Sequence, residues 1–308
     1  MIVNMDAIAY LKTLDDQCAQ CCVTSPPFWG LRDYGVEGQF GLEPTLEEYT
    51  AKMVSVFREV RRVLRDDGTL WLNLGDSYSG GGHGGGGSYA TDLRPKNLIG
   101  IPFRVAFALQ ADGWILRQDI IWAKPNPMPE SVTDRCTKSH EYIFMFSRSS
   151  RYYYDAKAIS EPAIYCDDDG IRNVYKDEKA YDGKHADKQR GHGRRHAGFN
   201  DGWDAMTKDE QCCALRNKRD VWVIATAPFK GAHFATFPPK LVKPCILAGC
   251  PEGGVVLDPF MGSGTTAVVA ESLGRKWIGC DLNPDYCKIA DERIEKETAK
   301  FSLFNRGK

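Results

Sequence analysis

The chain has 308 residues, of which 43% are hydrophobic and 26% are charged. This composition is that of a globular protein and excludes a disordered or fibrous chain. The formal net charge of −1 excludes a protein that coats nucleic acid through a global positive field. No stretch approaches the roughly 18 consecutive apolar residues of a membrane span, so we expect no membrane association. At roughly 150 residues per domain, the length predicts two domains, or one large domain with an insertion.

The eleven cysteines lie in apolar segments rather than at the spacings of a disulfide framework. This predicts reduced thiols and a cytoplasmic protein. Cys18, Cys21 and Cys22 form a C-x-x-C-C cluster, but the other close pair, Cys212–Cys213, lacks the spacing of a second zinc-ligand pair. We therefore predict no metal site.

The first elements are a strand at Ile2–Val3, a helix carrying Ile8, Leu11 and Leu14, and a strand at Cys21–Val23. Pro26-Pro27 ends this strand in a rigid loop. Thr45 and Glu48 form a capping box, and apolar residues from Tyr49 to Leu64 recur at helical spacing. We expect Asp67-Gly68 to end that helix.

Further strands and helices alternate downstream. The sequence predicts strands at Thr69–Leu74, Trp114–Trp122, His140–Phe146 and Arg219–Thr226, and helices at Pro102–Ala111 and Pro238–Gly249. A β-α-β unit follows, with Val255–Leu257, Thr265–Leu273 and Lys276–Asp281, and a last helix begins near Asn283-Pro284. This alternation predicts an α/β fold with a doubly wound, mostly parallel sheet. The polar segment 165–217 interrupts the pattern and is the candidate insertion.

A glycine loop, Asp258 to Thr266 (DPFMGSGTT), separates the strand and the helix of the β-α-β unit. In such sheets, ligands bind at the carboxyl ends of the strands, where Gly262 and Gly264 let a ligand approach the backbone. Asp281, at the end of the next strand, suits hydrogen bonds to ribose hydroxyls. A dinucleotide stays open as the ligand. The loop has no phosphate-binding lysine, which excludes a Walker loop.

A second loop, Thr24-Ser25-Pro26-Pro27-Phe28, offers hydrogen-bond acceptors and an aromatic ring. Ser25 has a hydroxyl, and Pro26 has a carbonyl but no N–H. A stiff loop of this kind suits a planar base with an exocyclic amine. A rigid turn with Phe28 in the core is the simpler alternative.

Together these two loops resemble the catalytic and cofactor motifs of DNA amino-methyltransferases that use S-adenosylmethionine (SAM). The order of catalytic motif, variable basic segment and cofactor motif resembles the circularly permuted beta class. Other blocks fit the family as well, among them Asn4-Met5-Asp6, Leu74-Gly75-Asp76, Trp122–Pro129, Ser139–Tyr142 and His233–Pro238. The resemblance implies a Rossmann-like sheet. It divides the chain into a catalytic half (1–150), a target-recognition insertion (151–217) and a cofactor-binding half (218–308).

The resemblance also implies residue roles. The target base is flipped out of the duplex and stacks on Phe28, while Ser25 and the Pro26 carbonyl, in the loop that Pro27 stiffens, accept hydrogen bonds from its amine. The implied SAM-binding residues are Asp6, Thr24, Phe237, Asp258, Pro259, Phe260, Gly262, Ser263, Gly264, Thr265, Thr266, Asp281, Leu282 and Asn283.

Ser before Pro-Pro resembles cytosine-N4 enzymes, so we favour cytosine N4 over the alternative, adenine N6. A methyltransferase acting on RNA or on protein glutamine fits less well, because its loops carry Asn-Pro-Pro-Tyr. A nicotinamide-dependent oxidoreductase is a remote alternative that leaves the Ser25 loop unexplained.

Residues 184–199 (KHADKQRGHGRRHAGF) form a local basic patch, whose side chains suit contacts to phosphate and guanine. The predicted DNA-binding residues are Lys124, Arg135, Lys188, Arg190, Arg194 and Arg195. The loops at Trp29–Gly38 and 80–87 are weaker candidates for closing over DNA. We expect a bacterial or phage-encoded monomer or homodimer that acts on double-stranded DNA, with a restriction endonuclease as a candidate counterpart.

Overall fold

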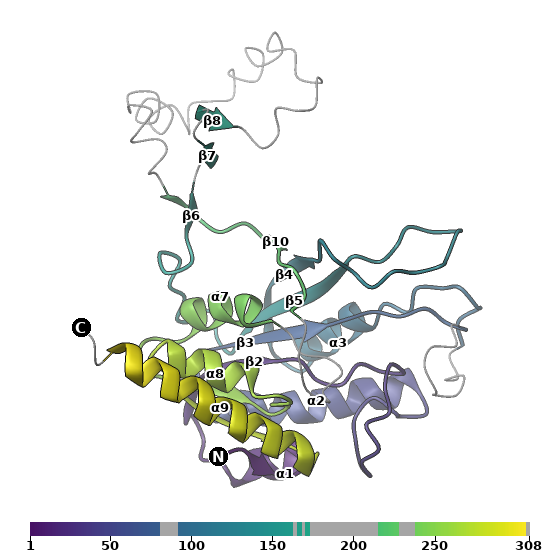
Figure 1. Cartoon of the computed structure of the whole chain (residues 1–308). Coiled ribbons are helices and arrows are strands. Elements are labelled where there is room, and N and C mark those ends of the chain that lie inside the picture. The colour runs from purple at the N-terminus through teal and green to yellow at the C-terminus, as the bar shows by residue number, and fades with distance from the viewer. Residues whose placement is uncertain (81–91, 163–164, 168–169, 173–214, 228–237, 306–308) are drawn as a thin grey trace. The chain divides into compact units, whose positions relative to one another are not determined.

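The computed structural model describes residues 1–80, 92–162, 165–167, 170–172, 215–227 and 238–305 (Figure 1). The chain divides into two units, of which the first joins Met1–Asp155 to Arg219–Lys308 and the second is Ala156–Lys218. The described part of the second unit contains two short antiparallel pairs. These are β6 (Glu161–Pro162) with β9 (Leu215–Arg216), and β7 (Tyr165–Asp167) with β8 (Gly170–Arg172).

The first unit is built on a sheet whose described strands run in the order β1-β12-β11-β2-β3-β5-β4-β10. Their bounds are β1 Val3–Asn4, β2 Ala19–Thr24, β3 Leu64–Leu74, β4 Ile115–Ala123, β5 His140–Ser147, β10 Val221–Val223, β11 Val255–Asp258 and β12 Lys276–Asp281. Strand β5 runs antiparallel to both of its neighbours, and all the other pairs are parallel. The predicted α/β fold with a mostly parallel sheet is therefore confirmed.

The helices form two groups. Helices α1 (Ala7–Thr13), α2 (Leu46–Val63) and α3 (Ile101–Ala111) pack in sequence, α1 on α2 and α2 on α3. Helices α7 (Pro239–Gly249), α8 (Thr265–Ser272) and α9 (Pro284–Asn305) do the same, and Figure 1 shows them in front of the strands. The first group shares the main hydrophobic core with β2, β3 and β5. Among the described residues, no helix has both the length and the apolar character needed to cross a membrane.

The predicted boundaries of α2, β3 and β10 were wrong. Helix α2 ends at Val63, before Asp67-Gly68, because Leu64 is extended and pairs with Ala19 of β2. Strand β3 therefore begins at Leu64 rather than at Thr69, where the apolar run suggested. Strand β10 is shorter than the predicted range 219–226, since its pairing with β4 covers only Val221–Val223.

The cysteine cluster lies in the core. Cys21 and Cys22 are fully buried on β2, where an apolar setting raises the pKa of both thiols well above its usual value. Within the described ranges, no group of three His, Cys, Asp or Glu side chains could hold a metal ion.

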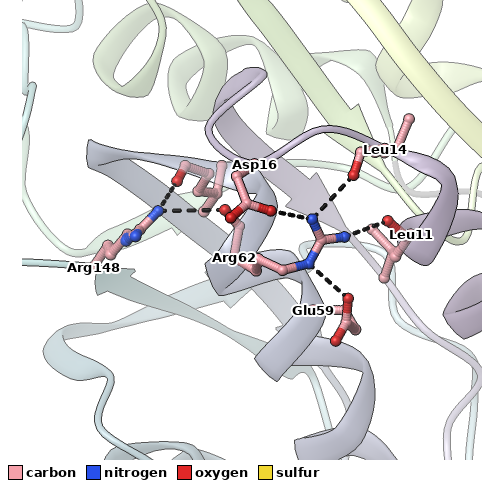
Figure 2. Close-up of polar contacts among 7 residues, drawn as sticks. Leu11, Leu14, Asp16, Glu59, Arg62 and Arg148 are labelled. Carbon is pink, nitrogen blue, oxygen red and sulfur yellow. Dashed lines mark hydrogen bonds and ion pairs between the residues drawn. The ribbon is translucent and has the colours of Figure 1, made fainter.

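Arg62 fixes the end of α1 to α2 (Figure 2). Its guanidinium donates to the carbonyl oxygens of Leu11 at 2.8 Å and Leu14 at 3.0 Å, and it pairs with Glu59 at 2.9 Å and with Asp16. The carbonyls at the end of a helix need such partners. The contact therefore holds in place a helix whose other end contributes to the site described next.

Candidate active site

Four strands bring polar side chains to one edge of the sheet. Strands β1, β12, β11 and β2 are parallel neighbours, so their carboxyl ends lie on the same side. Asp6 follows β1 closely, Asp281 and Asp258 are the last residues of β12 and β11, and Ser25 follows β2. In open α/β sheets this edge is where ligands bind.

A pocket with about 830 Å³ of empty space, part of it open to solvent, lies at this edge. The pocket brings together many of the predicted site residues, namely Asp6, Ser25, Pro27, Pro259, Phe260, Gly262, Ser263, Thr265, Asp281, Leu282 and Asn283.

Asp281 is held in the pocket by backbone groups. One carboxylate oxygen accepts from the Gly262 N–H at 2.8 Å and the other from the Asn283 N–H at 2.9 Å. Burial raises the pKa of Asp281 above its ordinary value. Each oxygen keeps a further lone pair, so the carboxylate can also accept from hydroxyl groups of a ligand. Asp6 caps α1 by accepting from the Ala9 N–H at 2.9 Å.

The glycine loop turns tightly before α8. Gly262 and Gly264 have φ values of 53° and 77°, in the left-handed region that favours glycine. From α9, the Arg293 guanidinium donates to the Ser263 carbonyl and hydroxyl, both at 3.0 Å, and to Thr265 Oγ1 at 2.9 Å. The loop that lines the pocket is therefore held by helix α9 as well as by its own strand.

Four of the predicted SAM-binding residues that the structure describes, Thr24, Asp258, Gly264 and Thr266, do not line the pocket. Asp258 is fully buried and accepts from Thr24 Oγ1 and Thr266 Oγ1, both at 2.6 Å, and from the Phe260 N–H at 3.0 Å. Burial raises the pKa of Asp258 to about 6. These residues join the end of β2 to the glycine loop.

The Ser25 loop is fixed by neighbouring strands and by α2. The Ser25 hydroxyl donates to Asn73 Oδ1 of β3 at 3.0 Å, and the Tyr49 hydroxyl donates to the Pro27 carbonyl at 2.9 Å. Phe28 lies against Gly75, where an added Cβ would come within 2.6 Å of the ring. Because the Ser25 hydroxyl proton is donated to Asn73, the lone pairs of Ser25 Oγ are left to accept from a ligand. Pro26 and Phe28 are not among the pocket-lining residues.

The prediction missed one wall of the pocket. Its remaining lining residues are Ala7, Tyr34, Val36, Gln39, Phe40, Met261 and Tyr286. Tyr34 meets Tyr286 edge-on at 6.2 Å between ring centroids, and Phe40 meets Phe260 at 5.3 Å. The segment that we expected over DNA therefore places Tyr34 and Val36 in the pocket wall. In the sequence, only the high aromatic content of residues 28–40 could have indicated that this segment forms a wall of the pocket.

The predicted DNA contacts are less exposed than expected where the structure describes them. Lys124 pairs with Glu141. Arg135 pairs with Glu130 at 2.6 Å and lies 4.1 Å from the centroid of the Tyr78 ring. Their role in DNA binding stays a prediction. Phe237, Lys188, Arg190, Arg194 and Arg195 lie outside the described residues, as does all of the 80–87 loop except Gly80.

Comparison with known proteins identifies the class of this fold and pocket. Residues 19–292 match the N6/N4 family of DNA methylases. The chain is 43% identical to the Type II methyltransferase M.XycI of Xanthomonas campestris pv. cyanopsidis, over 96% of this chain and 87% of the relative. It is 45% identical to M.SmaI of Serratia marcescens, over 95% and 90%.

Solved structures share the fold at low sequence identity. The PvuII DNA methyltransferase (cytosine-N4-specific) has a TM-score of 0.63 at 19% identity, with 99% of this chain and 92% of that chain covered. The M1.HpyAVI–SAM complex has a TM-score of 0.53 at 16% identity, with 95% and 98% covered. The fold is therefore the Rossmann-like fold of these methyltransferases.

The chain belongs to the N6/N4 DNA methylase family. It is a DNA amino-methyltransferase of the Type II group, and SAM is the methyl donor of this family. This membership excludes the nicotinamide-dependent oxidoreductase that the glycine loop alone left open.

Proposed function

We propose that this enzyme methylates the N4 amine of cytosine in double-stranded DNA. The observation that carries the proposal is the Ser25 hydroxyl, which donates to Asn73 at 3.0 Å and so faces the pocket as an acceptor. Cytosine is favoured because serine at this position resembles the cytosine-N4 enzymes of the family. The adenine-N6 alternative would use the same loop and the same cofactor.

The pocket suits SAM in its chemistry. Asp281, with both oxygens fixed by backbone N–H groups, would hold the ribose hydroxyls, and Asp6 would lie near the adenine. Gly262, Ser263 and Thr265 would hold the methionine half, with aromatic rings such as Phe260 lining the apolar wall. The cofactor supplies an electrophilic methyl group on a sulfonium.

The substrate base would be positioned by the Ser25 loop. The lone pair of an exocyclic amine is delocalised into the ring, which makes the nitrogen a poor nucleophile. Hydrogen bonds from the amine to Ser25 Oγ and the Pro26 carbonyl favour a tetrahedral nitrogen with its lone pair free. Phe28, backed by Gly75, offers a ring for stacking the flipped base. Positioning is then the main contribution of these residues to the rate.

The wider role follows from the Type II names of the relatives. We propose that the enzyme acts in the bacterial cytoplasm beside a restriction endonuclease with the same recognition sequence. The basic patch at 184–199 would contribute to recognition of that sequence.

Nucleoside mass spectrometry of methylated DNA tests the function. Unmethylated plasmid DNA is incubated with the enzyme and SAM carrying a deuterated methyl group, and is then digested to nucleosides. We expect labelled 4-methylcytosine. Labelled 6-methyladenine would overturn the choice of base, and no labelled nucleoside would overturn DNA amine methylation on this substrate. Ser25→Ala should lower the yield strongly, while Ser55→Ala, on the exposed face of α2, serves as a matched control.

A further inference from the structure

We propose that Glu141 is a positioning residue for methyl transfer, which acts by fixing the orientation of the Asn73 side-chain amide. This inference rests on the proposed function of the Ser25 loop and adds to it a residue on another strand. Through Asn73, Glu141 determines whether the Ser25 hydroxyl meets the substrate as an acceptor or as a donor.

Asn73 is placed so that its amide has a definite orientation. It lies on β3 in an otherwise apolar run and is only 4% exposed. Its Oδ1 accepts from Ser25 Oγ at 3.0 Å, while its Nδ2 donates to Glu141 Oε2 at 3.2 Å and to the Tyr142 carbonyl at 3.1 Å. An ionised carboxylate and a backbone carbonyl can only accept. Both therefore demand the NH₂ end of the amide, which leaves the oxygen for Ser25.

The opposite orientation would be wrong for the substrate. If the amide turned over, Asn73 Nδ2 would donate to Ser25 Oγ, and the hydroxyl proton would point toward the substrate. An exocyclic amine also presents N–H groups, so two donors would face each other. The orientation seen in the structure gives the amine an acceptor instead.

Glu141 is itself held by a cation. It lies on β5, which runs antiparallel to β3, and its second oxygen pairs with Lys124 at the end of β4. The Lys124 ammonium lies 4.3 Å from the centroid of the Trp122 ring. The side chains of Lys124 and Glu141 are 17% and 18% exposed. This half-enclosed ion pair holds the Glu141 carboxylate in place beside the Asn73 amide.

The role is one of orientation rather than proton removal. An amide does not pass a proton along as a carboxylate does, so Asn73 separates Ser25 from Glu141 chemically. Glu141 stabilises one of the two orientations of the Asn73 amide, and this orientation determines where the Ser25 hydroxyl proton points. This distinction makes the inference testable with variants that reverse the hydrogen bonds.

The first test exchanges the amide of Asn73 and the carboxylate of Glu141 between the two positions. In Glu141→Gln, the one remaining side-chain oxygen pairs with Lys124, so the NH₂ group of the variant side chain faces Asn73 Nδ2. We expect kcat to fall by about tenfold or more, as for a lost charge-assisted hydrogen bond. Asn73→Asp alone places two carboxylates together and should be at least as damaging. The double variant restores an acceptor for Ser25 and a donor beside it but leaves a carboxylate oxygen facing the Tyr142 carbonyl, so it should recover part of the lost kcat and exceed both single variants. Failure of the double variant to exceed both single variants would overturn the inference.

A second test separates this role from a merely structural one. Glu141→Gln should leave the KM for SAM unchanged, as should Glu47→Gln, a surface control on α2 that should also keep full kcat. In a Ser25→Ala background, Glu141→Gln should have almost no further effect on kcat, because the hydroxyl through which it acts is gone. An equal effect in both backgrounds would overturn the inference.

A third measurement needs no turnover. The side-chain amide of Asn73 can be followed by NMR with ¹⁵N-labelled asparagine. Its NH₂ protons should be protected from exchange in the wild type and should lose that protection in Glu141→Gln. Unchanged protection would overturn the inference even if the enzyme proved inactive on the DNA chosen. Because the kinetic variants are compared on whichever base is methylated, an adenine product would overturn the proposed base but not the role of Glu141.

Discussion

Thr24 donates a hydrogen bond of 2.6 Å to the Asp258 carboxylate, and this contact joins β2, which leads into the Ser25 loop, to β11, which leads into the glycine loop. Thr266, in the first turn of α8, donates to the other oxygen of the same carboxylate at 2.6 Å. Asp258 is fully buried and faces two hydroxyls and a backbone N–H. The Ser25 loop and the glycine loop are thus held to each other by a single carboxyl group outside the pocket.

Asp258 should make stability depend on pH in a definite direction. Its pKa in the folded protein is about 6, above the value of about 3.9 in an unfolded chain. The folded state therefore binds the extra proton between about pH 4 and 6, and the cost of burying the charge is relieved as the pH falls. Between pH 7 and 5, the wild type should gain about 1–1.5 kcal/mol in free energy of unfolding relative to Asp258→Asn.

Urea unfolding of both proteins at the two pH values measures this difference. The asparagine side chain introduced in the variant can still accept from Thr24 and can donate to Thr266, whose hydroxyl also lies 3.3 Å from the Val23 carbonyl. The variant should therefore fold, and other titrating groups cancel in the comparison. A difference that stays constant with pH would contradict the prediction.

Asp281→Asn should weaken cofactor binding. The two backbone N–H groups of Gly262 and Asn283 each meet a carboxylate oxygen, whereas an asparagine must turn its NH₂ toward one of them. We expect the Kd for S-adenosylhomocysteine to rise by about 10- to 100-fold, from the cost of a donor left unpaired. Isothermal titration calorimetry measures it. Asp285→Asn, an exposed position on α9, is the control and should bind normally.

Gly75→Ala should disturb the substrate side alone. The added Cβ would lie 2.6 Å from a Phe28 ring carbon, so the ring must move, at an overpacking cost of about 1–3 kcal/mol. We expect kcat/KM for DNA to fall by about tenfold, with an unchanged Kd for S-adenosylhomocysteine, because Gly75 is not among the lining residues. Adding Phe28→Leu should change kcat/KM less in the Gly75→Ala background than in the wild type. Equal effects would show that Gly75 does not act through the ring.

The aromatic wall should contribute to cofactor affinity. Tyr34 and Tyr286 both line the pocket and meet edge-on at 6.2 Å. Such a pair contributes about 0.5–1.5 kcal/mol beyond its buried area. Tyr286→Ala should therefore raise the Kd for S-adenosylhomocysteine by at least about threefold. Tyr286→Phe keeps the ring contact and should bind nearly as well as the wild type. Equal losses in the two variants would assign the effect to the hydroxyl group instead.

Most of the fold could be predicted from local patterns. The Thr45 cap, the spacing from Tyr49 to Leu64 and the apolar strands each act over a few residues, so a sequence displays them directly. The start of β3 could not be predicted in the same way. Leu64 is extended because Ala19 pairs with it, and a contact between distant segments leaves no local pattern.

The same distinction between local patterns and distant contacts applies to the residues of the site. Each predicted residue that lines the pocket sits in or beside a recognisable loop at the end of a strand. Tyr34 and Tyr286 were not predicted as pocket residues, because only the order of the strands in the sheet brings their segments together. Asn73 could have been found, since it is a single amide within the apolar strand TLWLNL, and a polar group in such a place needs a partner.

The pocket combines segments that lie far apart in the sequence, from Asp6 to Tyr286, and strand β1 pairs with β12. During synthesis, the substrate loop leaves the ribosome long before the strands that complete its cofactor site. A chain that stops before β11 carries the Ser25 loop but no glycine loop, and one that stops before β12 lacks Asp281. A fragment that ends before β11 therefore lacks most of the residues that line the pocket, and we expect it not to bind SAM.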